Sequence, residues 1–123
     1  MKAIIGVQSL DGFFLESKNF ARRLDAGGKT KECDFELSFS TPAQLVSELS
    51  PKRMELLQVL KEAGPLSIRA LAKRMGRNYS NVHTDVQRLI EHGLIEKDAD
   101  DLVLVPWDDV VVRMDASLMR LAA

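Results

Sequence analysis

The sequence predicts an α+β fold, in which a short strand-helix-strand arm precedes a helical domain that ends in a β-hairpin. Residues 66–97 contain, in order, a short amphipathic helix, a glycine turn, a longer amphipathic helix and a strand. This order is typical of a helix-turn-helix, which presents its second helix to the major groove of DNA. Residues 51–97 also hold nine Lys/Arg against five Asp/Glu, although the formal net charge of the chain is −1. We therefore predict a winged helix-turn-helix with a cationic surface.

The arm is predicted to span residues 1–40. Residues 2–9 have the composition of a strand, apolar residues recur at helical spacing over 10–24, and residues 34–40 alternate between apolar and polar. All five phenylalanines of the chain lie in this arm. Three elements of this length cannot close a core of their own. We expect the arm to pair with a second copy of the chain as a dimerisation element, and a plain extension packed on the same chain is the alternative.

The winged helix-turn-helix domain is predicted over residues 41–114, and two helices open it. Each begins with a hydroxyl N-cap followed by proline, at Thr41-Pro42 and at Ser50-Pro51, where the missing proline N–H costs nothing. The second of these helices should end at Gly64-Pro65. It carries the broad apolar surface of a helix buried beneath the next two, formed by Leu56, Leu57, Val59 and Leu60.

The helix-turn-helix itself is predicted from Ser67 to Gly93. Ser67 and Asn78 are suitable N-caps for its two helices, Gly76 is a suitable stop for the first, and the second should run to about His92. The first helix turns one apolar stripe inwards, formed by Ile68, Leu71, Ala72 and Met75. At roughly 100° per residue, the second helix has an apolar side as well, formed by Val82, Val86, Leu89 and Ile90.

The opposite side of this second helix is polar but nearly free of acids. It carries Ser80, Thr84, Gln87 and Arg88, with Asn81 and His83 on its flanks. Amides, hydroxyls and a guanidinium suit base edges and phosphates, whereas a merely solvated helix face more often carries Glu and Lys. An ordinary solvated face stays open as the alternative.

A two-stranded wing is predicted over residues 94–96 and 102–105, with an acidic turn at its tip. Three aspartates in residues 98–101 disfavour insertion of this tip into the minor groove, where wings usually carry Arg or Lys. We therefore expect only Lys97, at the base of the wing, near a phosphate.

The end of the chain carries one aromatic anchor and one more strand pattern. Trp107 is expected to pack in the core or in an interface. Residues 109–114 form a further candidate strand, and the tail over residues 115–123 is either a short helix or a frayed end.

Several motifs of this domain resemble a known family. The chain contains Gly76-Arg77, Tyr79, Asn81-Val82-His83, Asp85-Val86, Leu89, Gly93-Leu94-Ile95-Glu96 and Val105-Pro106-Trp107-Asp108. These motifs resemble the winged helix-turn-helix of MarR-like bacterial and archaeal transcriptional regulators, in particular a group of small antitoxin-type DNA-binding proteins with an NVH…GLIE…VPWD core. The resemblance extends over residues 49–109 and implies DNA binding. Members of this group often accompany a small toxin, so the resemblance also implies an antitoxin role as an alternative.

No catalytic or metal-binding pattern is evident in the sequence. His83 and His92 are too far apart to grip a metal without distant ligands, and the single Cys33 has no partner for zinc or for an internal disulfide. We expect no enzyme activity and no cofactor. The chain has neither an apolar run of membrane-spanning length nor a signal-peptide pattern, so we expect a cytoplasmic protein without membrane association.

The sequence therefore predicts a dimeric, sequence-specific regulator that binds double-stranded DNA. Its simplest form is a repressor that places two recognition helices in successive major grooves of a palindromic operator, about 34 Å apart. The expected contacts to bases or nearby phosphates are Ser80, Asn81, His83, Thr84, Gln87 and Arg88. The expected contacts to the DNA backbone are Arg69, Lys73, Arg74, Arg77, Asn78 and Lys97. Within this scheme, Arg77→Ala should weaken binding to all sequences.

Two other classes of function stay open. The first is an antitoxin that neutralises a small toxin by protein contact, with the acidic residues 98–115 covering a basic surface and DNA autoregulation as a second role. The other is a winged helix that binds only RNA or protein, against which the amide- and hydroxyl-rich helix face argues.

Overall fold

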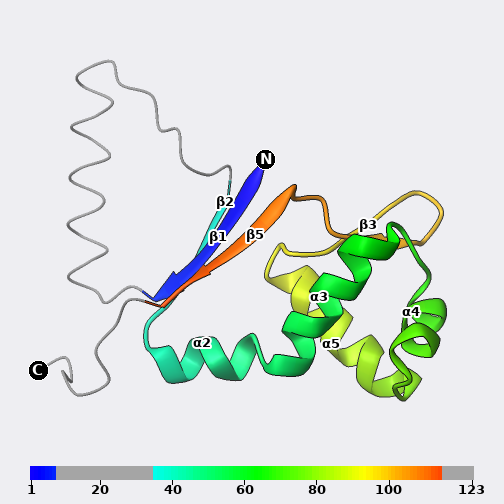
Figure 1. Cartoon of the computed structure of the whole chain (residues 1–123), viewed down its shortest axis with the longest axis horizontal. Coiled ribbons are helices and arrows are strands. Elements are labelled where there is room, and N and C mark those ends of the chain that lie inside the picture. Colours follow the sequence, from blue (N-terminus) through cyan, green and yellow to red (C-terminus); the bar gives the residue numbers. More distant parts are fainter. Residues whose placement is uncertain (8–34, 115–123) are drawn as a thin grey trace, which may run out of the picture. The chain divides into compact units, whose positions relative to one another are not determined.

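The computed structural model describes residues 1–7 and 35–114. The chain divides into two compact units, one formed by residues 1–48 and 108–123 and the other by residues 49–107. Four helices and two small sheets are found in the described residues, in agreement with the α+β class (Figure 1). The predicted helix over 10–24 and the tail over 115–123 lie outside the described residues.

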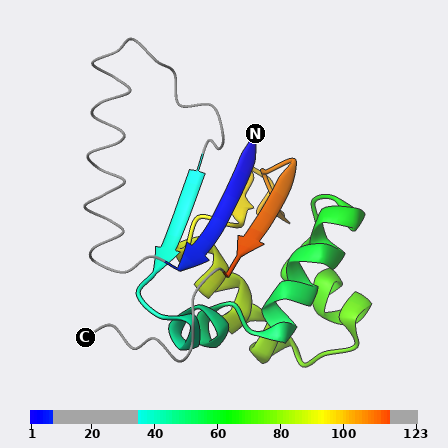
Figure 2. The same ribbon diagram turned by 60° about the vertical axis from the view of Figure 1, so that its left-hand side comes forward.

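The first unit is built around a three-stranded parallel sheet. Its strands are β1 (Lys2–Val7), β2 (Phe35–Phe39) and β5 (Asp109–Arg113), in the order β2-β1-β5. Figure 2 shows the three strands running in the same direction. Ile4 of β1 lies opposite Glu36 of β2 and Val111 of β5. Three successive residues of β1, Ala3, Ile4 and Ile5, are buried, as expected of a central parallel strand covered on both faces.

Helix α2 (Pro42–Glu48) also belongs to this first unit. The Thr41 hydroxyl accepts the Gln44 N–H at 3.1 Å, which confirms the predicted N-cap. Leu45 is completely buried, and α2 contacts β1 and β2. The units therefore differ from the predicted boundaries, which assigned residues 41–48 and 108–114 to the helix-turn-helix domain. The physical reason is the packing of α2 on the sheet and the pairing of β5 with β1.

The second unit begins with three helices, α3 (Pro51–Ala63), α4 (Ile68–Met75) and α5 (Tyr79–Glu91). The predicted caps are confirmed. The Ser50 hydroxyl accepts the Arg53 N–H at 3.3 Å, and the Ser67 hydroxyl accepts the Ala70 N–H at 3.1 Å. Gly76 ends α4 in the left-handed conformation, with φ 64° and ψ 33°. The buried side chains of these helices come from the predicted apolar stripes: Leu56, Leu57, Leu60, Ile68, Leu71, Ala72, Val82, Val86 and Leu89.

A short antiparallel hairpin completes the second unit. Its strands are β3 (Glu96–Lys97) and β4 (Val103–Leu104), shorter than the predicted strands over 94–96 and 102–105. The segment between α3 and α4 joins the hairpin, because Leu66 and Val103 exchange two backbone hydrogen bonds of 3.1 and 2.7 Å. At the tip, Asp98 Oδ1 accepts the Asp100 and Leu102 N–H groups. The aspartate that begins the tip therefore stabilises the turn by accepting backbone N–H groups two and four residues further along the chain.

The aromatic anchor expected near the end of the chain is part of this unit. Trp107 is half-buried, and its indole N–H donates to the Gly93 carbonyl at 3.0 Å. This bond ties the segment after β4 to the C-terminal end of α5. A buried or half-buried indole N–H normally finds such a partner, and here that partner lies within the chain.

Candidate nucleic-acid interface

Helix α5 has one buried side and one exposed side, as its sequence pattern predicts. Val82, Val86 and Leu89 are completely buried and fix the orientation of the helix in the second unit. On the other side, Ser80, Asn81, His83 and Thr84 are all exposed, and we call these four residues the outer face of α5. Gln87 is half-buried and lies one turn further along. In the part of the chain that the structure describes, nothing covers the hydrogen-bonding side chains of the outer face, so a ligand can reach them.

The α4–α5 turn holds the start of the outer face in place. Asn78 is extended, with φ −63° and ψ 133°, and its side-chain oxygen accepts the Ser80 N–H at 2.8 Å. The cap leaves the Asn78 NH₂ group as the part of this side chain that can donate to a phosphate. Thr84 Oγ1 donates to the Ser80 carbonyl at 3.0 Å. The Thr84 hydroxyl therefore keeps its oxygen as an acceptor for a ligand, while its hydrogen points to the helix backbone.

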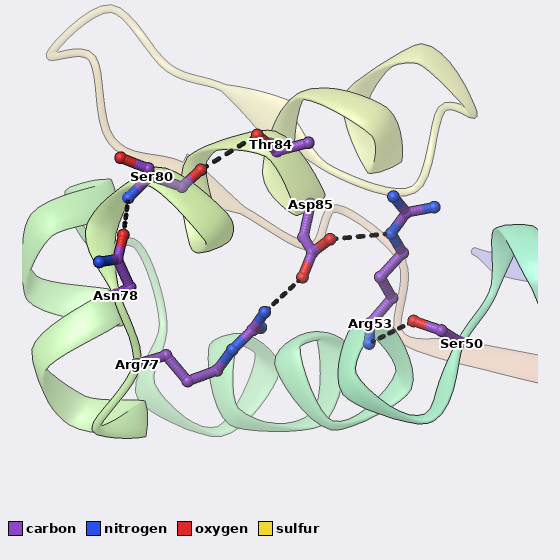
Figure 3. Close-up of polar contacts among 7 residues, drawn as sticks. All are labelled: Ser50, Arg53, Arg77, Asn78, Ser80, Thr84 and Asp85. Carbon is purple, nitrogen blue, oxygen red and sulfur yellow. Dashed lines mark hydrogen bonds and ion pairs between the residues drawn. The ribbon is translucent and has the colours of Figure 1, made fainter.

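Asp85 forms ion pairs with two arginines from different parts of the second unit. Its Oδ1 lies 3.0 Å from Arg53 Nε at the start of α3, and its Oδ2 lies 2.8 Å from Arg77 Nη2 in the α4–α5 turn. Figure 3 shows the carboxylate between the two guanidinium groups. The three side chains, which we call the ion triad, are only 14–17% exposed. This arrangement fixes α5 to α3 and to the turn before it.

The ion triad changes the interpretation of Arg77. The sequence predicted Arg77 as a contact to the DNA backbone, but its side chain is 17% exposed and paired with Asp85. Its Nη1 is buried and has no hydrogen-bond partner within the described residues. Arg77 therefore serves to hold α5 in place, and its replacement would disturb the fold as well as any DNA contact. Asp85 and Arg53 were not predicted as partners, because 32 residues separate them in sequence.

A second arginine of the predicted set is also paired, but at the surface. Arg88 Nη1 donates to Glu91 Oε2 at 2.8 Å, and the two side chains are 45% and 62% exposed. Such an exposed pair is weak, so it leaves Arg88 able to exchange its partner for a phosphate. Both acids of α5, Asp85 and Glu91, are thus neutralised by arginines.

Helix α4 places cations beside α5. Arg69, Lys73 and Arg74 are exposed, and we call them the α4 cations. The Arg69 guanidinium carbon lies 5.4 Å from the centroid of the Tyr79 ring, in a cation–π contact. The side chains of the α4 cations are thus available at the surface, as their predicted contacts to the DNA backbone require.

Tyr79 is a feature that the sequence analysis did not assign to the site. It is the first residue of α5, it is 46% exposed, and its ring centroid lies 5.9 Å from that of His83. The sequence did contain an indication, because a large aromatic directly follows the N-cap of the helix and precedes the outer face. A continuous row of side chains thus crosses α4 and α5. We call it the aromatic row, and its members are Arg69, Tyr79 and His83.

The last predicted cation lies on the hairpin of the second unit. Lys97 Nζ is 3.9 Å from Asp101 Oδ1, and the two side chains are 43% and 89% exposed. Asp101 has a left-handed backbone with φ 65°. The hairpin tip therefore presents acids next to its one cation. The net negative charge of the tip disfavours contact with a phosphate.

Other kinds of site find no support in the described part of the chain. Residues 1–7 and 35–114 contain no group of three or more His, Cys, Asp or Glu that could hold a metal ion. Among the same residues, no helix has the length and apolar character needed to cross a membrane.

Comparisons with known proteins give one match. No curated protein and no solved structure matches the chain significantly. A family model described as HVO_A0114 matches residues 48–112. The match covers α3, α4, α5 and the hairpin, together with most of β5. Because it extends over more than half of the sequence, the chain belongs to the HVO_A0114 family.

Proposed function

We propose that the protein is a sequence-specific DNA-binding transcriptional regulator of the winged helix-turn-helix type, with α5 as its recognition helix. The observation that carries this proposal is the composition of the exposed surface around α5. Hydroxyl, amide and imidazole groups of the outer face lie beside the α4 cations, and both acids of α5 are ion-paired. A surface of this kind can donate to phosphates and exchange hydrogen bonds with base edges.

The order of elements supports the winged form of the motif. Helices α3, α4 and α5 are followed by the β3–β4 hairpin, and the Leu66–Val103 bridge connects the hairpin to the segment before α4. In such proteins the helix after the turn enters the major groove, and its N-terminal residues contact the bases. In this chain those residues are Tyr79, Ser80, Asn81 and His83.

Dimeric binding to a palindromic operator is the form of this proposal that we favour. A single small recognition helix contacts few base pairs, and two-fold dimers double the site by placing two helices about 34 Å apart. The first unit offers a surface for pairing, because β5 is an outer strand of its sheet and Val112 and Met114 are 40% and 45% exposed. Occupation of a promoter by such a dimer would repress transcription by occlusion.

Selection from a random pool of DNA duplexes tests the proposal directly. The expected result is enrichment of a palindromic sequence, bound with a dissociation constant that rises steeply with salt concentration. The oligomeric state of the free protein, measured by light scattering, should be a dimer. If repeated selection enriches no sequence over the starting pool, the proposal is wrong.

A second candidate function is binding of a basic partner protein, such as a small toxin. The specific observation in its favour is the acidic hairpin tip, where Asp100 and Asp101 are exposed. Charge reversal in Asp100→Lys shows which partner the hairpin tip faces. If the tip faces DNA, the variant should bind duplex more tightly, and if it faces a basic protein, the variant should lose that protein in co-purification while it keeps its DNA affinity.

A further inference from the structure

The aromatic row crosses α4 and α5, and Tyr79 lies at its centre, between Arg69 and His83. We infer that Tyr79 is a specificity-determining residue, whose ring contacts the C5-methyl group of a thymine in the major groove. This inference rests on the proposed function, since it names the chemical group that one residue of the recognition helix contacts. It assigns the first residue of α5 to a methyl group and not to a phosphate.

The position of Tyr79 carries the first step. Tyr79 is the first residue of α5, directly after the Asn78 cap, and the N-terminal end of a recognition helix is the part that meets base edges. Its side chain is 46% exposed, although it is one of the larger apolar groups of the described residues. An exposed ring at this end of the helix would meet the floor of the groove before any other apolar group of α5.

The second step is that the ring is already held in place. The Arg69 guanidinium lies over it at 5.4 Å from the ring centroid, and the His83 ring lies 5.9 Å away at an interplanar angle of 37°. Arg69 comes from α4 and His83 from the next turn of α5, so the ring is supported from two helices. Binding then costs little side-chain entropy, because the ring does not have to be ordered by the DNA.

The third step concerns what such a ring can recognise. Base pairs in the major groove present hydrogen-bonding groups and one apolar group, the C5-methyl of thymine, which proteins distinguish by apolar contact. The four residues of the outer face are polar, and Thr84 contributes only a small methyl group beside its hydroxyl. Tyr79 is therefore the residue of this surface whose carbon atoms fit the thymine methyl. Its phenolic hydroxyl is the competing group, because it could donate to a phosphate instead.

The test replaces thymine by deoxyuridine, which pairs with adenine in the same way and lacks only the methyl group. The duplex is the sequence enriched by selection, with each thymine replaced in turn, in both half-sites where the sequence is symmetrical. Dissociation constants are measured for the full-length protein, for Tyr79→Phe and for Tyr79→Ala. Circular dichroism melts show whether each variant folds.

We expect one thymine position at which deoxyuridine weakens binding of the natural protein by about three- to fivefold, the effect of one methyl group removed from water. Tyr79→Phe keeps the ring and should keep this difference. Tyr79→Ala should bind the thymine and deoxyuridine duplexes equally, and more weakly than the natural protein binds thymine.

Two results would overturn the inference while the proposed function stands. In one, the natural protein binds the enriched duplex but shows no preference for thymine over deoxyuridine at any position, a comparison that does not depend on the folding of any variant. In the other, the natural protein prefers thymine at one position and Tyr79→Ala keeps that preference undiminished, which assigns the methyl contact to another residue. If no duplex is enriched at all, the proposed function fails first, and this inference fails with it.

Discussion

Asp85 illustrates how one residue can determine the orientation of a helix, here α5. Its carboxylate is the shared partner of Arg53 and Arg77, and all three side chains are at most 17% exposed. Asp85→Ala leaves two guanidinium groups close together in a partly buried place without their counter-charge. We expect a loss of about 3 kcal/mol in the free energy of unfolding, at the low end of the values for a broken buried pair because some solvent reaches the site. Urea denaturation followed by circular dichroism measures it.

Glu91→Ala is the matched control for Asp85→Ala. It also removes a carboxylate that pairs with an arginine of the same unit, but the Arg88–Glu91 pair is 45% and 62% exposed. We expect this variant to lose at most about 0.5 kcal/mol, as exposed pairs on a helix do. Equal losses for the two variants would contradict the structural role that we assign to the ion triad.

The outer face of α5 and the α4 cations should respond differently to substitution. Asn81→Ala removes a side chain that can bond a base edge, so we expect it to cost about 1–3 kcal/mol with the operator and little with random duplex. Lys73→Ala removes one exposed cation, so we expect it to weaken binding to both duplexes and to reduce the salt slope by about 1. Lys73 is preferable to Arg77 for this measurement, because Arg77 also holds the ion triad together.

Titration of operator and random duplex with each variant, at several salt concentrations, measures both effects. The comparison has a clear contrary result. If Asn81→Ala loses the same affinity for operator and for random duplex, Asn81 does not contribute to specificity. If Lys73→Ala leaves the salt slope unchanged, the α4 cations do not contact phosphates.

At the scale of elements, the turn between α4 and α5 depends on a single glycine. Gly76 has φ 64°, and a Cβ built there would meet no atom within 4 Å. The cost of Gly76→Ala is therefore purely conformational, and we expect about 1–2 kcal/mol of lost stability for a left-handed alanine. Gly76→Asn should cost less, because asparagine tolerates this conformation. Denaturant unfolding of the pair checks the order, and a larger loss for Asn than for Ala would contradict this explanation.

The helices were predictable from the sequence because their limits depend on short-range bonds. The caps at Ser50, Ser67 and Asn78 each connect residues two or three positions apart, and the stop at Gly76 follows from the properties of glycine. The apolar stripes were predictable for the same reason, because their residues are only three or four positions apart in sequence. The limits of the hairpin strands were less predictable, because β3 and β4 are only two residues long and depend on their pairing with each other.

Contacts between distant parts of the chain were not predictable in the same way. Residues 109–114 were expected to form a strand, but nothing in their pattern indicates that β5 lies parallel to β1 with Val111 opposite Ile4. The ion triad was not predictable either, because its members come from α3, the α4–α5 turn and α5. Tyr79 was overlooked because its importance depends on Arg69, which another helix supplies.

At the scale of the whole molecule, the two units differ in how the chain builds them. The second unit is one continuous segment, residues 49–107, whereas the first combines segments from both ends of the chain. Among residues 1–7 and 35–114, most of the buried apolar side chains lie in the second unit, from Leu49 to Val105. We therefore expect a polypeptide of residues 49–107 to fold by itself, with a helical circular dichroism spectrum and a cooperative unfolding transition. Its stability should be low, because a domain of roughly 60 residues buries a limited share of its surface.

The same polypeptide separates recognition from pairing. It keeps α4, α5 and the outer face, so it should still prefer the operator over random duplex, but as a monomer that binds each half-site independently and more weakly than the full chain. A matched control is the same polypeptide with Leu89→Ala, which removes a completely buried side chain at a cost of about 2–5 kcal/mol. In a domain this small that loss should abolish both the unfolding transition and DNA binding. If residues 49–107 remain unfolded without the substitution, the second unit needs the first for its stability. If they fold and bind as tightly as the full chain, pairing through the first unit contributes nothing to recognition.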